Sequence, residues 1–209
     1  MINVRTARML ADYKQWANQR LFDNLAQLPP GEVEKQRASV FKTMIGTLNH
    51  IYVVDCIWQA HLEGRWHGFK TSHELVHPAL TDLRLAQQDV DHWYSDWTAR
   101  QTDASLDKPV RFTFVSGESG TMSAGAILMH VINHASYHRG WVIQMYFEIP
   151  AMPPMTDLPI YLRETDPQFN SLNVPMVEPT CAPQFSSATN VLPDRYRGRR
   201  SRPWTARTA

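Results

Sequence analysis

Cysteine is scarce in this chain. Only Cys56 and Cys181 occur among 209 residues, and neither belongs to a Cys-x-x-Cys pair. We therefore expect neither a disulfide framework nor a thiolate metal site. The first residues also lack the apolar core that is typical of a signal peptide, so we expect a protein of the reducing cytoplasm.

Long apolar runs and a strong net charge are missing as well. No stretch approaches the roughly 18 apolar residues of a membrane span, and the formal net charge is +1. We therefore expect no membrane insertion, and the charge of the whole chain gives no reason to expect a nucleic-acid partner. The charge is nevertheless uneven, because residues 1–165 carry 15 Lys or Arg against 17 Asp or Glu, whereas residues 166–209 carry 6 Arg against 3 acids. This predicts a nearly neutral domain over 1–165 and a proline-rich, basic, mostly disordered tail over 166–209.

Apolar residues recur at helical spacing in four long segments. They predict helices over about 10–28, 40–62 and 80–99, and a fourth that starts after Thr121 or Ser123 and ends before Pro150. Residues 109–115 alternate between polar and apolar side chains, and a glycine-rich turn follows them, which predicts a short β-hairpin. The expected fold class is therefore all-α, a four-helix bundle with a short β-hairpin before the fourth helix.

Three histidines share one stripe of the fourth helix. His130, His134 and His138 stand four residues apart, so that neighbours differ by only about 40° around the helix axis. A pair at this spacing can hold one metal ion. All three cannot do so easily, because His130 and His138 lie about 12 Å apart along the axis. Spacing alone leaves open which pair would bind.

A third ligand would have to come from another buried helix. His50 lies among Leu48, Ile51 and Val54 on the most apolar helix, which makes it the best candidate. Buried imidazoles lower stability unless something satisfies their nitrogens. Either a metal ion or a hydrogen-bonded network would do so.

Four local motifs resemble the DinB-like family of bacterial proteins, which is named for damage inducibility. Their order and spacing both fit, and the resemblance covers residues 1 to about 165. The motifs are Y-K-Q-W-A-N at 13–18, G-T-L-N-H-I-Y-V-V-D-C-I-W at 46–58, H-V-I-N-H-A-S-Y-H-R-G at 130–140 and T-D-L-P-I-Y-L-R-E at 156–164.

The resemblance implies a four-helix bundle in which His50, His134 and His138 hold a divalent metal ion. His130 would then lie near the site without binding the ion. Imidazole suits zinc or nickel, which we expect first, and also iron or copper. Trp141 departs from the pattern, since the family usually has glutamine there, so the resemblance implies nothing about hydrogen bonding at that position.

Relatives of this fold include thiol-dependent transferases, which suggests a metal-dependent thiol transferase that acts on a small molecule with a low-molecular-weight thiol. A hydrolase is the second enzymatic alternative, and a non-catalytic metal-binding protein of the stress response is the other one. A homodimer is left open. The sequence has neither the carboxylate cluster nor the glycine-rich phosphate loop of a polymerase, so nothing suggests that activity.

Two residues beside the expected ligands are candidates for cofactor or substrate binding. Tyr137 could donate a hydrogen bond to a substrate or to a metal-bound water. Arg139 could pair with an anion, although a carboxylate of a neighbouring helix is the partner we favour. Asp55 is expected to make a structural hydrogen bond or salt bridge, and His61 lies too far along its helix to share an ion with His50.

Overall fold

The computed structural model describes residues 2–167 of the chain. The disordered tail predicted over 166–209 therefore falls almost wholly outside the described residues. Within them lie six helices and one pair of strands. The long helices are α1 (Val4–Leu25), α2 (Met44–Leu62), α3 (Leu80–Ala99) and α5 (Ala124–Tyr146). In the part of the chain that is described, no helix combines the length and the apolarity that crossing a membrane would require.

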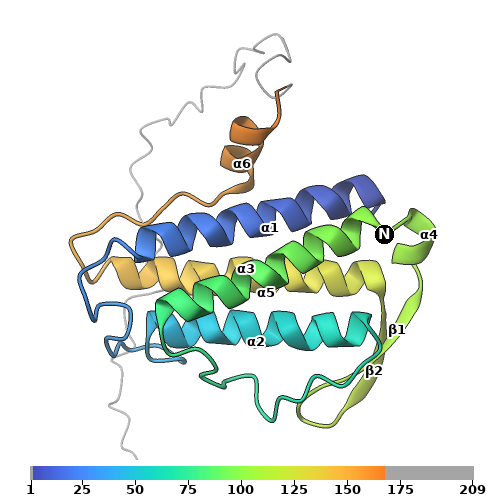
Figure 1. Ribbon diagram of the computed structural model, residues 1–209, viewed down its shortest axis with the longest axis horizontal. Coiled ribbons are helices and arrows are strands. Elements are labelled where there is room, and N and C mark those ends of the chain that lie inside the picture. Colours follow the sequence, from blue (N-terminus) through green and yellow to red (C-terminus); the bar gives the residue numbers. More distant parts are fainter. Residues whose placement is uncertain (1, 168–209) are drawn as a thin grey trace, which may run out of the picture. The chain divides into compact units, whose positions relative to one another are not determined.

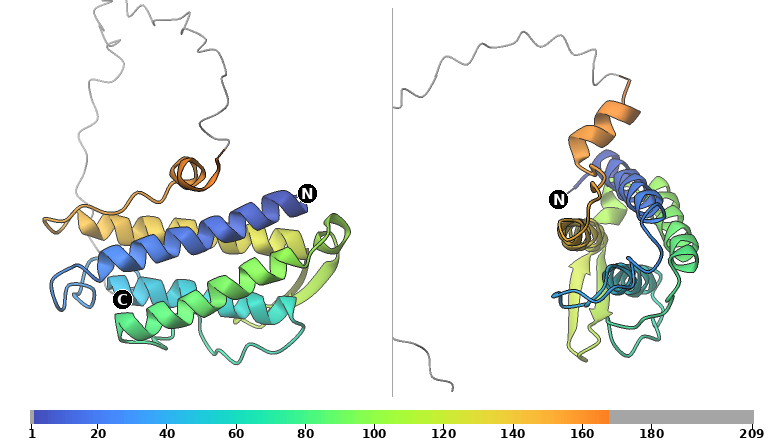
Figure 2. Two further views of the ribbon diagram at one scale, coloured as in Figure 1. Left: turned by 45° about the horizontal axis from the view of Figure 1, so that its top comes forward. Right: turned by 90° about the vertical axis from the view of Figure 1, so that its left-hand side faces the viewer.

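The four long helices form the predicted bundle. Helices α1 and α2 lie on one diagonal and α3 and α5 on the other, so that each helix packs mainly on two neighbours (Figure 2). Helices α2 and α3 run in one direction and α1 and α5 in the opposite direction (Figure 1). Because α2 and α3 are parallel neighbours, the segment 63–79 that joins them must travel back along the bundle.

The smaller elements lie at the bundle's ends and side. Strands β1 (Pro109–Thr113) and β2 (Ser119–Ser123) pair antiparallel in the register Val110↔Met122, which confirms the predicted hairpin. Helix α4 (Asp103–Leu106) was not predicted, and it is stabilised by a capping box between Thr102 and Ser105. Helix α6 (Leu158–Thr165) contacts α1.

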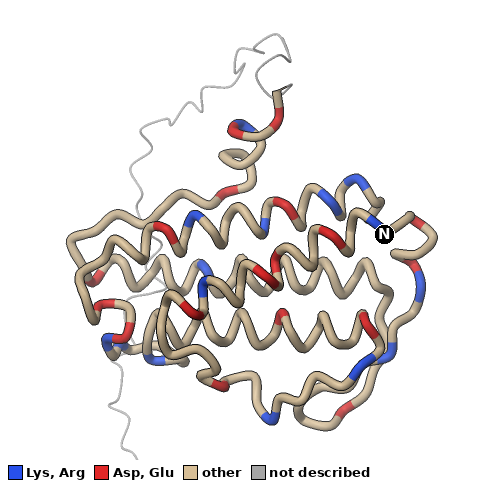
Figure 3. The backbone as a smooth tube through the Cα atoms, in the orientation of Figure 1, with Lys and Arg blue, Asp and Glu red and all other residues tan. Residues whose placement is uncertain are grey.

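Charge explains which helices are the most buried. Helices α2 and α5 each contain a single Asp, Glu, Lys or Arg, namely Asp55 and Arg139. Helices α1 and α3 carry such residues along their whole length, as the coloured positions in Figure 3 show. Since burying a charge costs free energy, the two charge-poor helices can bury most of their surface and the other two keep a solvated face.

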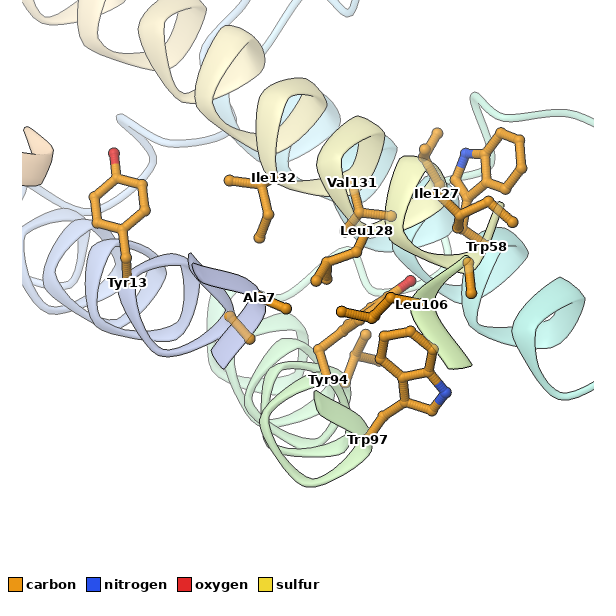
Figure 4. Close-up of a cluster of buried hydrophobic side chains, with 14 of the residues drawn as sticks. Ala7, Tyr13, Trp58, Tyr94, Trp97, Leu106, Ile127, Leu128, Val131 and Ile132 are labelled. Atoms are coloured by element: carbon orange, nitrogen blue, oxygen red, sulfur yellow. The ribbon is translucent and has the colours of Figure 1, made fainter. Parts of the chain in front are cut away.

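The core consists of two apolar clusters. Figure 4 shows part of the first, in which aromatic and aliphatic side chains of all four helices meet Leu106 of α4. The second occupies the other half of the bundle. Its principal members are Leu21, Phe22, Leu25, Met44, Ile45, Leu48, Ile51, Leu83, Ala135, Val142, Met145 and Tyr146.

A layer of buried polar side chains joins the long helices inside the bundle. Lys14 contacts Asp55 at 2.7 Å and also Asp91, and all three side chains are at most 2% exposed. Gln87 donates to both carboxylates, and Asn18 donates to Asp91. The structural hydrogen bond or salt bridge expected for Asp55 is therefore confirmed, and this layer ties α1, α2 and α3 together.

Helix α2 starts four residues later than the periodicity predicts. Lys42 has a φ of 63°, outside the helical region, and the Thr43 side chain caps the helix by accepting from the Gly46 N–H at 2.9 Å. Val40 and Phe41 therefore belong to the preceding loop. Apolar spacing alone could not reveal this, because the two residues continue the helical pattern.

Candidate metal centre

The three expected ligands converge in the structure. His50 comes from the second turn of α2, and His134 and His138 come from α5, which packs against α2. One nitrogen from each imidazole lies within 4.8 Å of the other two, and the three together form a group that could hold a metal ion. The Nε2 atoms of His50 and His134 are 3.1 Å apart. A shared ion at about 2.1 Å needs separations of roughly 3–4 Å, and the pair of His50 and His134 meets this condition.

The returning segment 63–79 orients His50. Its Nδ1 lies 2.7 Å from the backbone carbonyl oxygen of Ser72. Since a carbonyl can only accept, Nδ1 carries the proton and Nε2 presents a lone pair towards His134. Metal-binding histidines are commonly oriented in this way by a carbonyl on the other ring nitrogen.

Burial keeps the cluster uncharged. His50 and His138 are buried and His134 is half-buried. Burial is the largest cause, and together with the neighbouring histidines it lowers the pKa of His134 to about 2. Burial and His50 lower the pKa of His138 to about 4. All three rings are therefore neutral near pH 7, which is the form that binds a metal ion.

Hydrogen bonding within the cluster is incomplete. The Nδ1 atoms of His134 and His138 are buried and have no hydrogen-bond partner among residues 2–167. Buried polar atoms are usually satisfied, because leaving them unpaired costs free energy. The hydrogen bonds among the described residues therefore do not satisfy the cluster. Its three neutral imidazoles are a donor set that fits a divalent transition metal.

An aromatic wall, which the sequence did not reveal, covers the histidines. The Phe41 ring stacks on His50 with centroids 4.3 Å apart and meets His138 at 5.5 Å. The ring centroids of Trp141 and His138 are 4.7 Å apart, and those of His73 in the returning segment and His50 are 5.6 Å apart. Only the loop conformation around Lys42 turns Phe41 towards the site, so no sequence signal pointed to it.

The remaining histidines of the two helices lie outside the triad. The ring of His130 is 5.6 Å from that of His134 and packs against Trp58 at 5.0 Å. His61 packs against Trp58 at 5.5 Å and against His67. Neither belongs to the three-residue group that could hold an ion.

Tyr137 and Arg139 occupy very different positions. Tyr137 is 59% exposed, and its ring lies 5.1 Å from that of His138, on the solvent side of the site. Arg139 is buried and donates to Asn18 and Ser136, so that it joins the polar layer. Among the described residues, no carboxylate accepts a hydrogen bond from Arg139, so the expected pairing with a carboxylate of a neighbouring helix is not seen. The involvement of both residues in cofactor binding stays a prediction.

Comparisons with known proteins agree with this description. The model of the DinB family matches residues 1–171. Protein DinB of Bacillus subtilis (strain 168) is 27% identical over 164 residues, which cover 73% of this chain and 91% of that protein. The crystal structure of a DinB-like protein from Bacillus cereus ATCC 10987 superposes with a TM-score of 0.53 and 17% identity. That match covers 69% of this chain and 91% of the other, and it supports the fold alone.

Proposed function

The chain belongs to the DinB family, and from this premise and the geometry of the triad we propose that His50, His134 and His138 bind one divalent transition-metal ion. The observation that carries the proposal is the meeting of three neutral imidazoles from two helices in one buried cluster. Zinc and nickel are the ions we expect first, and iron and copper suit the same ligands.

The ligand set favours a reactive ion over a purely structural one. Three histidines leave at least one coordination position free, whereas structural sites are usually closed by four protein ligands. An ion in such a site lowers the pKa of a bound water or thiol, which makes it a nucleophile near neutral pH. The chain itself holds His50 in one tautomer through the Ser72 carbonyl and packs the Phe41 ring against it.

As the reaction we propose transfer of a small electrophile to a low-molecular-weight thiol. Hydrolysis is the weaker alternative, because no carboxylate among the described residues joins the triad to act as a general base. A metal-binding role in the stress response without turnover is the non-enzymatic alternative. A small-molecule substrate, a location in the cytoplasm and a homodimer belong to the proposal and stay predictions.

Metal content tests the binding proposal. The purified protein is dialysed against zinc or nickel, and bound metal is measured by elemental analysis. We expect about one equivalent for the parent and less than about a tenth for His134→Ala. His61→Ala is the matched control, because His61 is also a buried histidine of the bundle but lies outside the triad. Unchanged metal binding in His134→Ala would refute the assignment.

Turnover is tested separately. The metal-loaded protein is incubated with a panel of low-molecular-weight thiols and electrophiles, and conjugates are detected by mass spectrometry. Metal-dependent conjugate formation that is lost in His134→Ala supports the enzyme. Tight metal binding without any conjugate favours the non-catalytic alternative.

A further inference from the structure

Phe41 packs against two of the three histidines of the triad. Its ring is nearly parallel to that of His50, at an interplanar angle of 21°, and meets His138 edge-on at 73°. The side chain is only half-buried, so one face of it still contacts solvent. A ligand that approaches the histidines from this side meets the phenyl ring first.

The backbone holds the ring in this position. The Thr43 N–H donates to the Phe41 carbonyl, two residues earlier, at 2.7 Å, and Lys42 between them has a φ of 63°. A positive φ is uncommon for a residue with a side chain, and such conformations gather at functional sites. Gly46 permits the close approach, because a Cβ atom there would lie 2.5 Å from the Phe41 carbonyl oxygen.

Two cavities flank this aromatic ring. One, of about 450 Å³, is lined by Trp141, and the other, of about 420 Å³, is lined by His73 and by Phe41 itself. Val40 lines both cavities. The Phe41 ring stands between their walls, 5.8 Å from Trp141 and 5.1 Å from His73. No histidine of the triad lines either cavity, and each space ends at rings that pack against the triad, Trp141 in the first and Phe41 and His73 in the second.

Both cavities combine apolar and polar walls. The first brings the apolar side chains of Trp141 and Met145 together with the ion pair of Arg37 and Glu148. The second sets apolar side chains beside polar and charged ones, among them Lys42. Pockets of a few hundred cubic ångströms suit small organic ligands, and mixed walls of this kind favour one with an apolar and a polar part.

We propose that Phe41 determines access to the triad, and that its displacement joins the two cavities into one cleft for a substrate with an apolar body and a polar end. The apolar body lies against Trp141 and the polar end points towards Lys42. This inference rests on the proposed metal-binding function, because a substrate in the cleft would have to reach the bound ion.

The rate of metal release tests the first half of the proposal. Zinc-loaded protein is mixed with excess EDTA and a colorimetric zinc indicator, and release is followed over time. Phe41→Ala should release zinc at least about tenfold faster than the parent, because its removal uncovers the triad. Phe41→Leu keeps apolar bulk and should fall between the two. Phe147→Ala is the control, because Phe147 is 76% exposed and should release zinc at the parental rate.

Two imidazoles that differ only in their apolar body test the second half. Cobalt-loaded protein is titrated with 1-methylimidazole and with 1-benzylimidazole, and binding is followed by visible absorption of the cobalt. The parent should bind the benzyl compound at least about fivefold more tightly, because its ring can pack against Trp141. Trp141→Gln should reduce the ratio of the two affinities to about one, and this ratio cancels any effect of the substitution on the ion itself, which both compounds share.

The outcomes separate this inference from the function on which it rests. If the parent binds no metal, both fail. If it binds metal but Phe41→Ala and Phe41→Leu release zinc at the parental rate, Phe41 does not control access. If Trp141→Gln retains the preference for the benzyl compound, the apolar cavity is not where the body of the ligand binds.

Discussion

Loss of the Lys14 side chain should strongly destabilise the bundle. Its ammonium group lies between the carboxylates of Asp55 and Asp91, and all three side chains are buried. Burial alone would lower the pKa of Lys14, but the two carboxylates outweigh it and raise the pKa. Lys14→Met replaces the cation with an apolar side chain of similar length and leaves two buried carboxylates facing each other. Breaking a buried ion pair in this way costs about 3–5 kcal/mol, a large fraction of the total stability of an ordinary domain.

Urea unfolding followed by circular dichroism measures this loss. Arg20→Met is the matched control, because Arg20 pairs with Glu164 in an exposed ion pair, with side chains 38% and 35% exposed. Such a pair contributes only about 0–1 kcal/mol. Changing Asp55 and Asp91 to asparagine in the Lys14→Met background should recover much of the loss, because the uncompensated charges disappear. If Lys14→Met costs no more than Arg20→Met, the buried layer does not stabilise the fold as argued.

Further predictions concern the site. The pKa values of His134 and His138 are lowered to about 2 and about 4 in the folded protein, so the unfolded chain binds more protons below its pKa near 6.5. The metal-free protein should therefore keep its full stability above pH 6.5 and lose up to about 2 kcal/mol per histidine by pH 5. A urea concentration at the unfolding midpoint that stays constant as the pH is lowered from 8 to 5 would contradict this. Gly46→Ala should push the Phe41 carbonyl away, which lowers the melting temperature and accelerates zinc release; unchanged values would argue against the close contact. Ser72→Ala should leave metal affinity unchanged in equilibrium dialysis, because only its backbone carbonyl is used. Chelation should lower the melting temperature of the loaded protein by mass action and leave far-UV helicity intact at moderate temperature; outright unfolding would make the ion structural.

Much of the fold follows from local patterns. Apolar spacing predicts the long helices. Ser123 was one of the two residues predicted to precede the fourth helix, and its side chain accepts from the Ala126 N–H there. The same spacing wrongly extends α2 back to Val40, because apolar periodicity contains no signal for the turn at Lys42. Lys14 and Asn18 look like ordinary polar residues of an amphipathic helix, and their burial became evident only when their partners on the other helices were in place.

What the sequence by itself determined is the local geometry of the site. Two histidines four residues apart lie on one face of a helix in any protein that folds that stretch as a helix. It did not decide between His130 and His138 as the partner of His134, and only the resemblance to a family pointed to the second. The tertiary structure decided what meets this pair. His50 is 84 residues away from His134, and the packing of α2 on α5 brings the two together. The carbonyl that orients His50 arrives because parallel neighbours need a returning segment, and Phe41 covers the site because of one backbone turn. These contacts depend on the path of the chain through space, which side-chain periodicity does not encode.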